Sequence, residues 1–178
     1  MRNEKSITSW GNVAGWYDEY LRQPNTLQKE LILPNLLRIL GSLTSEGREA
    51  PVRVLDVACG LGFNAHAFAK AGADVVGVDV SIELIELARK GAGKFLVGAA
   101  DKLPVVGPFD IATFILAIQN IKNVSGAFSE CARVLVPNGK LVVVMNHPTF
   151  RIPKASEWGW DELRKVQYRR IERYLSEI

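Results

Sequence analysis

Short, continuously apolar runs alternate with helix-like segments between residues 52 and 145, and this alternation most constrains the fold. Polar and apolar residues do not alternate within the runs, so both faces of each strand should be buried, as in a parallel sheet covered by helices. Strands and helices that alternate along the sequence are typical of βαβ units. The sequence therefore predicts an α/β fold, in which a doubly wound, mostly parallel sheet of about five strands has helices on both faces. The predicted strands are 52–57, 74–80, 94–98, 109–116 and 140–145, and the predicted helices are 64–70, 82–90 and 124–135.

Different patterns flank this core, which predicts three regions within a single domain of 178 residues. Residues 1–50 should form an N-terminal helical cap, and residues 51–145 the core. Residues 146–178 should form a loop, followed from Trp160 by a C-terminal helix with a charged face.

The cap contains a predicted helix over residues 25–43. Pro34 interrupts it, so we expect either a kink or two abutting helices. Its apolar residues recur at steps of three and four and mark one helix face. They are Leu27, Leu31, Ile32, Leu36, Ile39, Leu40 and Leu43.

Composition excludes several classes of protein. The chain has 22 Lys and Arg against 19 Asp and Glu, and this net charge of +3 is too small to favour a nucleic-acid partner. The two cysteines exclude a disulfide scaffold and a four-cysteine zinc site, and we expect no metal. No apolar run approaches the roughly 18 residues of a membrane span, and the polar N-terminus lacks a secretory signal. We therefore expect a cytoplasmic protein that is not bound to a membrane.

The first predicted strand leads into a glycine-containing loop, Asp56-Val57-Ala58-Cys59-Gly60-Leu61-Gly62. Glycines remove side chains where a ligand must approach the backbone, and the following helix would aim its first amides at that ligand. In sheets of this type ligands bind at the carboxyl ends of the strands. A tight turn without any ligand is the alternative interpretation.

An acid at the end of the second predicted strand narrows the class of ligand. Asp79 follows Gly62 by 17 positions, where a carboxylate can accept hydrogen bonds from ribose hydroxyls. This position of the acid fits any ligand that contains adenosine, so it does not distinguish a nicotinamide cofactor from S-adenosylmethionine. However, Ala65 stands where a Gly-x-Gly-x-x-Gly motif would have its third glycine. Asp56 would also repel a pyrophosphate, and it suits a ligand with a positive amino group.

Together these segments resemble the class I S-adenosylmethionine-dependent methyltransferases, in particular the branch that acts on small molecules. The resemblance implies a Rossmann-like sheet, S-adenosylmethionine as the cofactor and transfer of its methyl group to a small-molecule acceptor. It covers about residues 10 to 145. The segments that carry it are Trp16-Tyr17-Asp18, Asp56–Gly62, Val76–Asp79, Gly98–Pro104, Phe109–Ala112 and Ala132–Lys140.

The resemblance also implies which residues bind the cofactor. In that family the glycine loop surrounds the methionine part, the acid after the second strand holds the ribose, and the loop after the third strand holds the adenine. An N-terminal Tyr-Asp segment closes over the cofactor. Here Ala99 occupies the usual place of the adenine-binding acid, so we assign that contact to Asp101. The implied cofactor-binding residues are Tyr17, Asp56, Gly60, Gly62, Asp79 and Asp101.

Two residues are candidates for the acceptor side of the site. His147 follows the fifth predicted strand directly and could act as a general base on a hydroxyl or amine, although a histidine that only packs or caps fits equally well. Gln119 lies beyond the fourth strand, where relatives often carry a pair of histidines. Two other functions stay open: a protein of the same fold that binds S-adenosylmethionine without methyl transfer, and an NAD-dependent oxidoreductase.

The end of the chain predicts self-association. The family's sheet has seven strands, the last two forming a hairpin beside the fifth, and only five are predicted here. Residues 141–145 would then form an exposed edge that is apolar on both faces, which favours pairing with another chain. We expect a homodimer, formed either through this edge or by exchange of the C-terminal helices.

Overall fold

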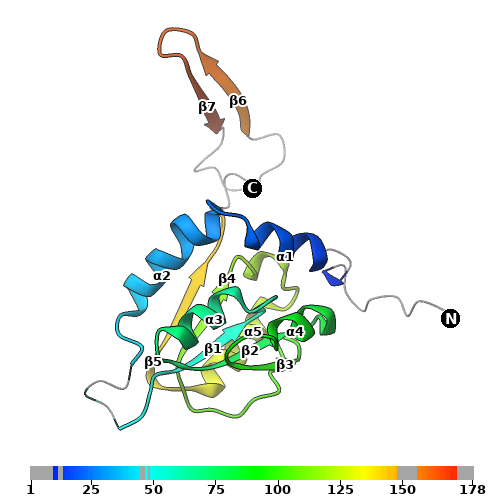
Figure 1. Ribbon diagram of the computed structural model, residues 1–178, viewed down its shortest axis with the longest axis vertical. Coiled ribbons are helices and arrows are strands. Elements are labelled where there is room, and N and C mark those ends of the chain that lie inside the picture. Colours follow the sequence, from blue (N-terminus) through cyan, green and yellow to red (C-terminus); the bar gives the residue numbers. More distant parts are fainter. Residues whose placement is uncertain (1–9, 12–13, 45–46, 48, 148–155, 172–178) are drawn as a thin grey trace, which may run out of the picture. The chain divides into compact units, whose positions relative to one another are not determined.

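The computed structural model describes residues 10–11, 14–44, 47, 49–147 and 156–171 (Figure 1). The chain divides into two compact units, Met1–Val144 and Met145–Ile178, and each is described by itself. The predicted boundary between a helical cap and a core, near residue 50, stays a prediction.

The first unit is built on a five-stranded parallel sheet, which confirms the predicted fold class. The strand order is β3-β2-β1-β4-β5, so that the chain starts in the middle of the sheet and winds outward in both directions. The strands are β1 (Arg53–Val57), β2 (Asp74–Asp79), β3 (Lys94–Val97), β4 (Phe109–Ile115) and β5 (Leu135–Val144).

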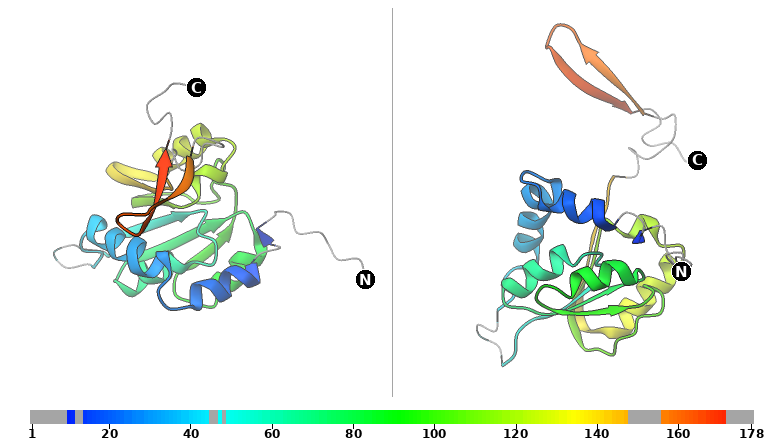
Figure 2. Two further views of the ribbon diagram at one scale, coloured as in Figure 1. Left: turned by 90° about the horizontal axis from the view of Figure 1, so that it is seen from above. Right: turned by 45° about the vertical axis from the view of Figure 1, so that its right-hand side comes forward.

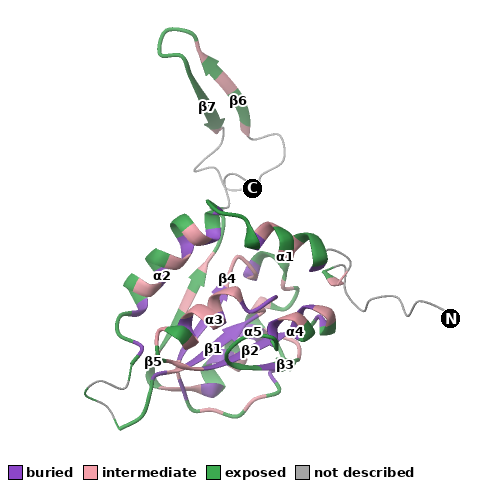
Figure 3. Ribbon diagram, viewed as in Figure 1, coloured by how far each residue is buried: buried purple, intermediate pink, exposed green. Residues whose placement is uncertain are grey.

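Helices cover both faces of this sheet (Figure 2). On one face α2 (Leu33–Leu40), α3 (Phe63–Lys70) and α4 (Ile82–Ala88) pack on side chains such as Val54 and Phe95. On the other face α5 (Val124–Val134) packs on Leu55 and Phe114. Adjacent residues of β1 thus enter different cores, which explains its continuously apolar sequence (Figure 3). The expectation that every strand is buried on both faces was wrong for the edge strands β3 and β5, which have exposed residues.

The N-terminal segment contains α1 (Ala14–Arg22), a π-helical turn η2 (Gln28–Ile32) and α2, which follows η2 directly. Two abutting helical segments were one of the two outcomes expected from Pro34, and this one is confirmed. The prediction of a single apolar face was wrong in part. Ile32, Leu36, Leu40 and Leu43 are buried, whereas Leu27, Leu31 and Ile39 are 46%, 55% and 52% exposed. The buried positions recur every four residues from Gln28 to Leu40, and Leu27, Leu31 and Ile39 each come one residue before such a position, so they lie beside the buried face.

β5 begins at Leu135, five residues before the predicted strand. Its pairing with β4 shifts register between Phe109 and Ile111, and Asn138 has a φ of 63°. The residues around Asn138 therefore form an irregularity inside the strand. β5 lies at one edge of the sheet, as predicted.

The predicted C-terminal helix is wrong over the described residues. The second unit contains an antiparallel hairpin of β6 (Ser156–Asp161) and β7 (Val166–Ile171), so residues 156–159 are not loop either. Residues 148–155 and 172–178 lie outside the described residues.

Local interactions explain why this segment is a hairpin. Asp161 accepts hydrogen bonds from the backbone N–H groups of Leu163 and Arg164, both at 3.0 Å, and so fixes the turn. Across the strands an ion pair joins Arg170 and Glu157 at 2.5 Å. Trp158 faces Arg169, whose guanidinium carbon lies 5.3 Å from the centroid of the indole. Cross-strand pairing, and not helical spacing, thus accounts for the aromatic and charged residues here.

No helix in the described part of the chain combines the length and apolar composition that crossing a bilayer requires.

Candidate functional site

The loop between β1 and α3 adopts backbone conformations that favour glycine. Gly60 has a φ of 56° and Gly62 a φ of 75°. A Cβ atom on Gly62 would lie 2.8 Å from the Phe95 ring, so glycine is required there for packing as well as for conformation. The nearest atom to a Cβ on Gly60 would be a ring carbon of Tyr17, at 3.9 Å. The two glycines therefore let the loop turn sharply, with the ring of Tyr17 beside it.

Asp79 fixes this loop to the end of β2. Its side chain is buried, and its two carboxylate oxygens accept hydrogen bonds from the backbone N–H groups of Gly60 and Ser81, both at 2.9 Å. Burial raises the pKa of Asp79, and the hydrogen bonds from backbone N–H groups oppose that rise. Each carboxylate oxygen has two lone pairs, so hydroxyl donors of a ligand can still be accepted. The sequence predicted that Asp79 contacts a ligand, but it did not predict the hydrogen bond between Asp79 and the backbone of Gly60.

Asp56, near the end of β1, is the most deeply buried carboxyl group of the site, with 1% of the residue exposed. Thr113 stands opposite it on β4, and its hydroxyl donates to Asp56 Oδ1 at 2.7 Å. The other oxygen, Oδ2, has no hydrogen-bond partner among the described residues. Burial raises the pKa of Asp56 to about 7, the charge of Asp79 adds to the rise, and the bond from Thr113 opposes it. The site thus holds an acceptor that the protein itself does not use.

Sequence reasoning missed Thr113, although a signal was present. It is the one hydroxyl within an apolar run that the sequence already predicted to be a buried strand. A buried hydroxyl needs a hydrogen-bond partner, so it marks a place where a polar neighbour must stand.

Tyr17 reaches the same site from α1. Its hydroxyl is hydrogen-bonded by the side chain of Gln28, at the start of η2. Burial raises the pKa of Tyr17, and the nearby charge of Asp56 adds to the rise. The charge of Asp56 thus acts on Tyr17, and the contacts of both residues with a cofactor stay predictions. Gln28 is a second residue that sequence reasoning missed, and no motif in the sequence points to it.

Asp101 is exposed, in the loop between β3 and β4. Its Oδ2 accepts a hydrogen bond from the side-chain amide of Asn123 at 3.1 Å. Asn123 in turn caps α5 by accepting from the backbone N–H of Gly126 at 3.0 Å. The structure thus gives Asp101 a partner at the start of α5, and its contact with adenine stays a prediction.

The two acceptor-side candidates lie in different units. Gln119 belongs to the short 3-10 helix η3 (Ile118–Asn120) after β4, and its side chain donates to the backbone oxygen of Leu116 at 2.6 Å. His147 comes shortly after β5 in sequence and belongs to the second unit. Their roles toward an acceptor stay predictions.

Comparison with known proteins decides the family. Residues 55–143, half of the chain, match the family described as a methyltransferase domain. The chain belongs to this methyltransferase family. The matched segment runs from β1 to β5, and so it contains Asp56, both glycines, Asp79 and Thr113.

Individual proteins resemble this methyltransferase domain over parts of their length. A demethylmenaquinone methyltransferase of Renibacterium salmoninarum is 38% identical over 102 residues, which are 55% of this chain and 43% of that protein. The solved structure of an S-adenosylmethionine-dependent methyltransferase from Mesorhizobium loti has a TM-score of 0.67 and 25% identity, covering 84% of this chain and 68% of that one. The solved structure of the cyclase SpnF has a TM-score of 0.51 and 28% identity, covering 61% of this chain and 43% of that one. The chain spans less than half the length of the curated relative.

Cys59 lies in the glycine loop, and the pKa of its thiol favours a packing role over a role as a nucleophile. Burial raises the pKa of its thiol well above the ordinary value, and the charges of Asp56 and Asp79 add to the rise. A thiol that stays protonated is a poor nucleophile. Within the described residues, no group of three or more His, Cys, Asp or Glu side chains could hold a metal ion.

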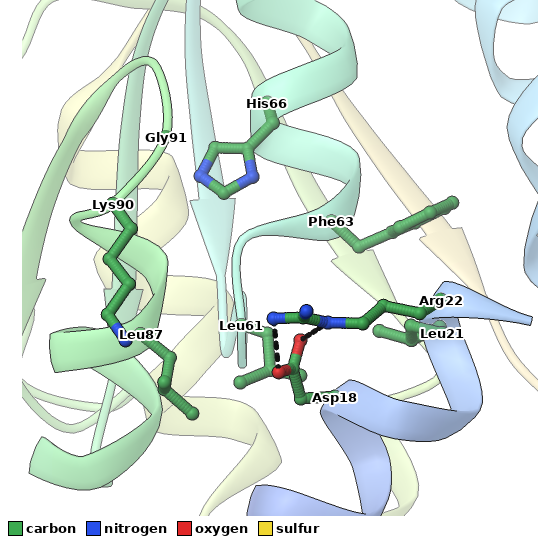
Figure 4. Close-up of a pocket in the computed structure, with 9 residues that line it drawn as sticks. All are labelled: Asp18, Leu21, Arg22, Leu61, Phe63, His66, Leu87, Lys90 and Gly91. Atoms are coloured by element: carbon green, nitrogen blue, oxygen red, sulfur yellow. Dashed lines mark hydrogen bonds and ion pairs between the residues drawn. The ribbon is translucent and has the colours of Figure 1, made fainter.

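A pocket of about 330 Å³ lies beside the glycine loop, between α1, α3 and the end of α4 (Figure 4). Asp18 and Arg22 form an ion pair at its side, at 2.8 Å. His66 forms a 2.8 Å hydrogen bond with the backbone oxygen of Ala88, and its ring packs edge-on against Phe95. None of the six predicted cofactor-binding residues lines this pocket. His66 thus joins α3 to the end of α4, which is a structural role.

Proposed function

We propose that this chain binds S-adenosylmethionine at the carboxyl ends of β1 and β2 and transfers the methyl group to a small-molecule acceptor. The observation that carries the proposal is Asp56. A buried carboxylate with one unused oxygen, close to a second carboxylate, favours a positively charged donor and disfavours a pyrophosphate. The amino group of a bound amino acid is such a donor, whereas a nicotinamide dinucleotide has a pyrophosphate at the corresponding loop.

Each residue of the site has a distinct part in this proposal. Asp56 would accept a hydrogen bond from the ammonium group of the methionine part, and the ring of Tyr17 would cover the loop beside Gly60. Asp79 would hold the loop and accept from the ribose hydroxyls. When bound, S-adenosylmethionine supplies a methyl group on a positively charged sulfur, which an acceptor can displace in line. The protein then needs to align the acceptor and to exclude water.

The acceptor side of the proposal rests on His147 and Gln119. His147 would remove a proton from a hydroxyl or amine as it becomes methylated, and Gln119 would contact the acceptor through its amide. The curated relative's name states that its substrate is demethylmenaquinone. Hydroxylated aromatic rings are therefore the first acceptors to screen. The small net charge of +3 supports a small molecule over a nucleic acid.

A second candidate is a protein of this fold that binds the cofactor without methyl transfer. The observation that favours it is the likeness to SpnF, which is named as a cyclase and not as a methyltransferase. Binding alone would not separate the two candidates, because both predict a cofactor site.

Two measurements test the proposal. Isothermal titration calorimetry with S-adenosylhomocysteine should give saturable binding. Asp56→Ala should weaken it, and a change of an exposed acid outside the site, Glu86→Ala, should leave it unchanged. Transfer of a labelled methyl group to pooled small metabolites should then identify an acceptor. Binding without transfer to any pool would favour the second candidate. Binding of NAD in place of S-adenosylhomocysteine would contradict both.

A further inference from the structure

Gln28 is a buried polar side chain with an unused acceptor. The residue is 7% exposed, and its Oε1 atom has no hydrogen-bond partner among the described residues. Buried polar atoms are nearly always hydrogen-bonded, because burial without a partner forfeits the bonds to water. An unpaired buried amide oxygen therefore requires an explanation.

The burial of Gln28 reverses what hydrophobicity alone would produce. Its neighbour Leu27 is 46% exposed, and Leu31, on the same turn, is 55% exposed. Leu27 and Leu31 were expected on the buried face, but the residues that share the buried side are Gln28, Ile32, Leu36 and Leu40, at steps of four. Gln28 begins the π-helical turn η2, and such turns occur frequently at functional sites. The helical segment thus places an amide inside and two leucines outside.

The contacts of Gln28 lead to the proposed methionine site. Its side chain is hydrogen-bonded to the Tyr17 hydroxyl, and Tyr17 lies within electrostatic reach of Asp56. Because the oxygen of Gln28 is unpaired, the bond to Tyr17 runs from the amide nitrogen, which donates to the phenolic oxygen. Oε1 of Gln28 and Oδ2 of Asp56 are thus two unused buried acceptors in one cluster joined by Tyr17.

We propose that Gln28 is a cofactor-binding residue, whose amide oxygen accepts a hydrogen bond from the ammonium group of the methionine part, together with Asp56. An ammonium group carries three donors, so it can serve both oxygens at once. The amide nitrogen meanwhile holds the Tyr17 hydroxyl, so that one side chain contacts the ligand and orients the covering ring. This inference rests on the proposed function.

The test compares two ligands on three proteins. S-adenosylhomocysteine has the amino-acid part, whereas 5′-methylthioadenosine ends at the sulfur. Gln28→Met keeps the length of the side chain and removes both the acceptor oxygen and the amide donor to Tyr17, whereas Gln28→Glu removes only the donor, so the difference between the two variants reports the acceptor. Gln23→Met makes the same change at an exposed glutamine five residues earlier and serves as the matched control.

Calorimetry should show that Gln28→Met binds S-adenosylhomocysteine about ten- to a hundredfold more weakly than wild type, since a hydrogen bond to a charged group is lost. Its affinity for 5′-methylthioadenosine should be unchanged, and Gln23→Met should match wild type for both ligands. Without ligand, Gln28→Met should unfold at about the same temperature as wild type, because the removal of an unpaired buried acceptor offsets the loss of the hydrogen bond to Tyr17. Gln28→Glu, which keeps an acceptor oxygen, should bind S-adenosylhomocysteine more tightly than Gln28→Met.

The inference is overturned if Gln28→Met binds S-adenosylhomocysteine as wild type does, or if it loses affinity equally for both ligands. A third ligand, S-adenosyl-3-thiopropylamine, keeps the ammonium group and lacks the carboxylate. If the loss of affinity disappears with this ligand, the amide contacts the carboxylate and the assignment to the ammonium group is wrong. If wild type binds no S-adenosylhomocysteine at all, the proposed function itself fails, which is a separate result.

Discussion

Replacing Asp56 by asparagine should make the protein more stable and less able to bind its ligand, with both effects growing as the pH rises. The pKa of Asp56 is raised from an ordinary value of 3.8 to about 7, first by burial and further by the charge of Asp79. The folded protein therefore holds a proton on Asp56 that the unfolded chain releases near pH 4. Between these two pH values the unfolded chain binds fewer protons, so the free energy of unfolding falls as the pH rises. Asparagine keeps the shape and removes this titration.

The size of the effect follows from the two pKa values. A rise from 3.8 to about 7 corresponds to about 4 kcal/mol of lost stability at pH values above 7. At pH 5 only about 1.5 kcal/mol of this loss has developed, because this pH is only slightly more than one unit above the pKa of the carboxyl in the unfolded chain. The stability gained by Asp56→Asn should therefore be larger at pH 8 than at pH 5 by about 2–3 kcal/mol.

Urea unfolding of both proteins at a series of pH values between 5 and 8 measures this difference directly. Thr113→Val provides a related control, because it removes the hydroxyl that donates to Asp56 and should raise the pKa of the carboxyl further. Calorimetry with S-adenosylhomocysteine over the same range should show affinity rising through about pH 7 for wild type and staying flat for Asp56→Asn. A stability difference that does not change between pH 5 and 8 would refute the reasoning, since Asp56 would then be ionised throughout.

Three further predictions follow from the rest of the site and from the sheet edge. Asp79→Ala should weaken S-adenosylhomocysteine binding by about ten- to a hundredfold and lower the unfolding temperature; unchanged affinity in calorimetry would mean that the ribose is not held there. His147→Ala and Gln119→Ala should lower turnover on an identified acceptor and leave cofactor affinity intact, as steady-state kinetics can show; full turnover by His147→Ala would leave that histidine without a catalytic role. The β5 edge should pair two chains into a dimer or aggregate; light scattering that finds a stable monomer at high concentration, with slow amide exchange over residues 142–144, would exclude this.

The sequence predicted the fold of the first unit because its signals there are local and agree with one another. Buried strands read as continuous apolar runs, and glycines and caps mark the ends of helices. Ser81, for example, is a typical capping residue just before α4, and its hydroxyl accepts from the backbone N–H of Leu84 at 3.4 Å. The second unit was mispredicted because its interactions are between strands. The pairing of Glu157 with Arg170 spans 13 residues, and helical spacing could not reveal it. The dimer route through exchanged C-terminal helices is withdrawn with the helix.

Only those residues of the candidate site that belong to a recognisable sequence motif could be predicted. Asp56, the two glycines and Asp79 stand in one recognisable pattern, and the structure gathers them at one edge of the sheet. Thr113 and Gln28 have no such pattern. Thr113 joins Asp56 only through the β1–β4 register, and Gln28 is buried because it shares a helix side with Ile32 and Leu36. Both depend on tertiary structure, which overrides local preference.

The central claim is that this site accepts the cofactor of a methyltransferase and not a dinucleotide. Parallel calorimetric titrations of the purified chain with S-adenosylhomocysteine and with NAD, at pH 8 where Asp56 is ionised, test this most directly. We expect saturable one-to-one binding of S-adenosylhomocysteine, about ten- to a hundredfold weaker in Asp79→Ala, and no heat of binding with NAD. Saturable binding of NAD, with none of S-adenosylhomocysteine, would contradict it.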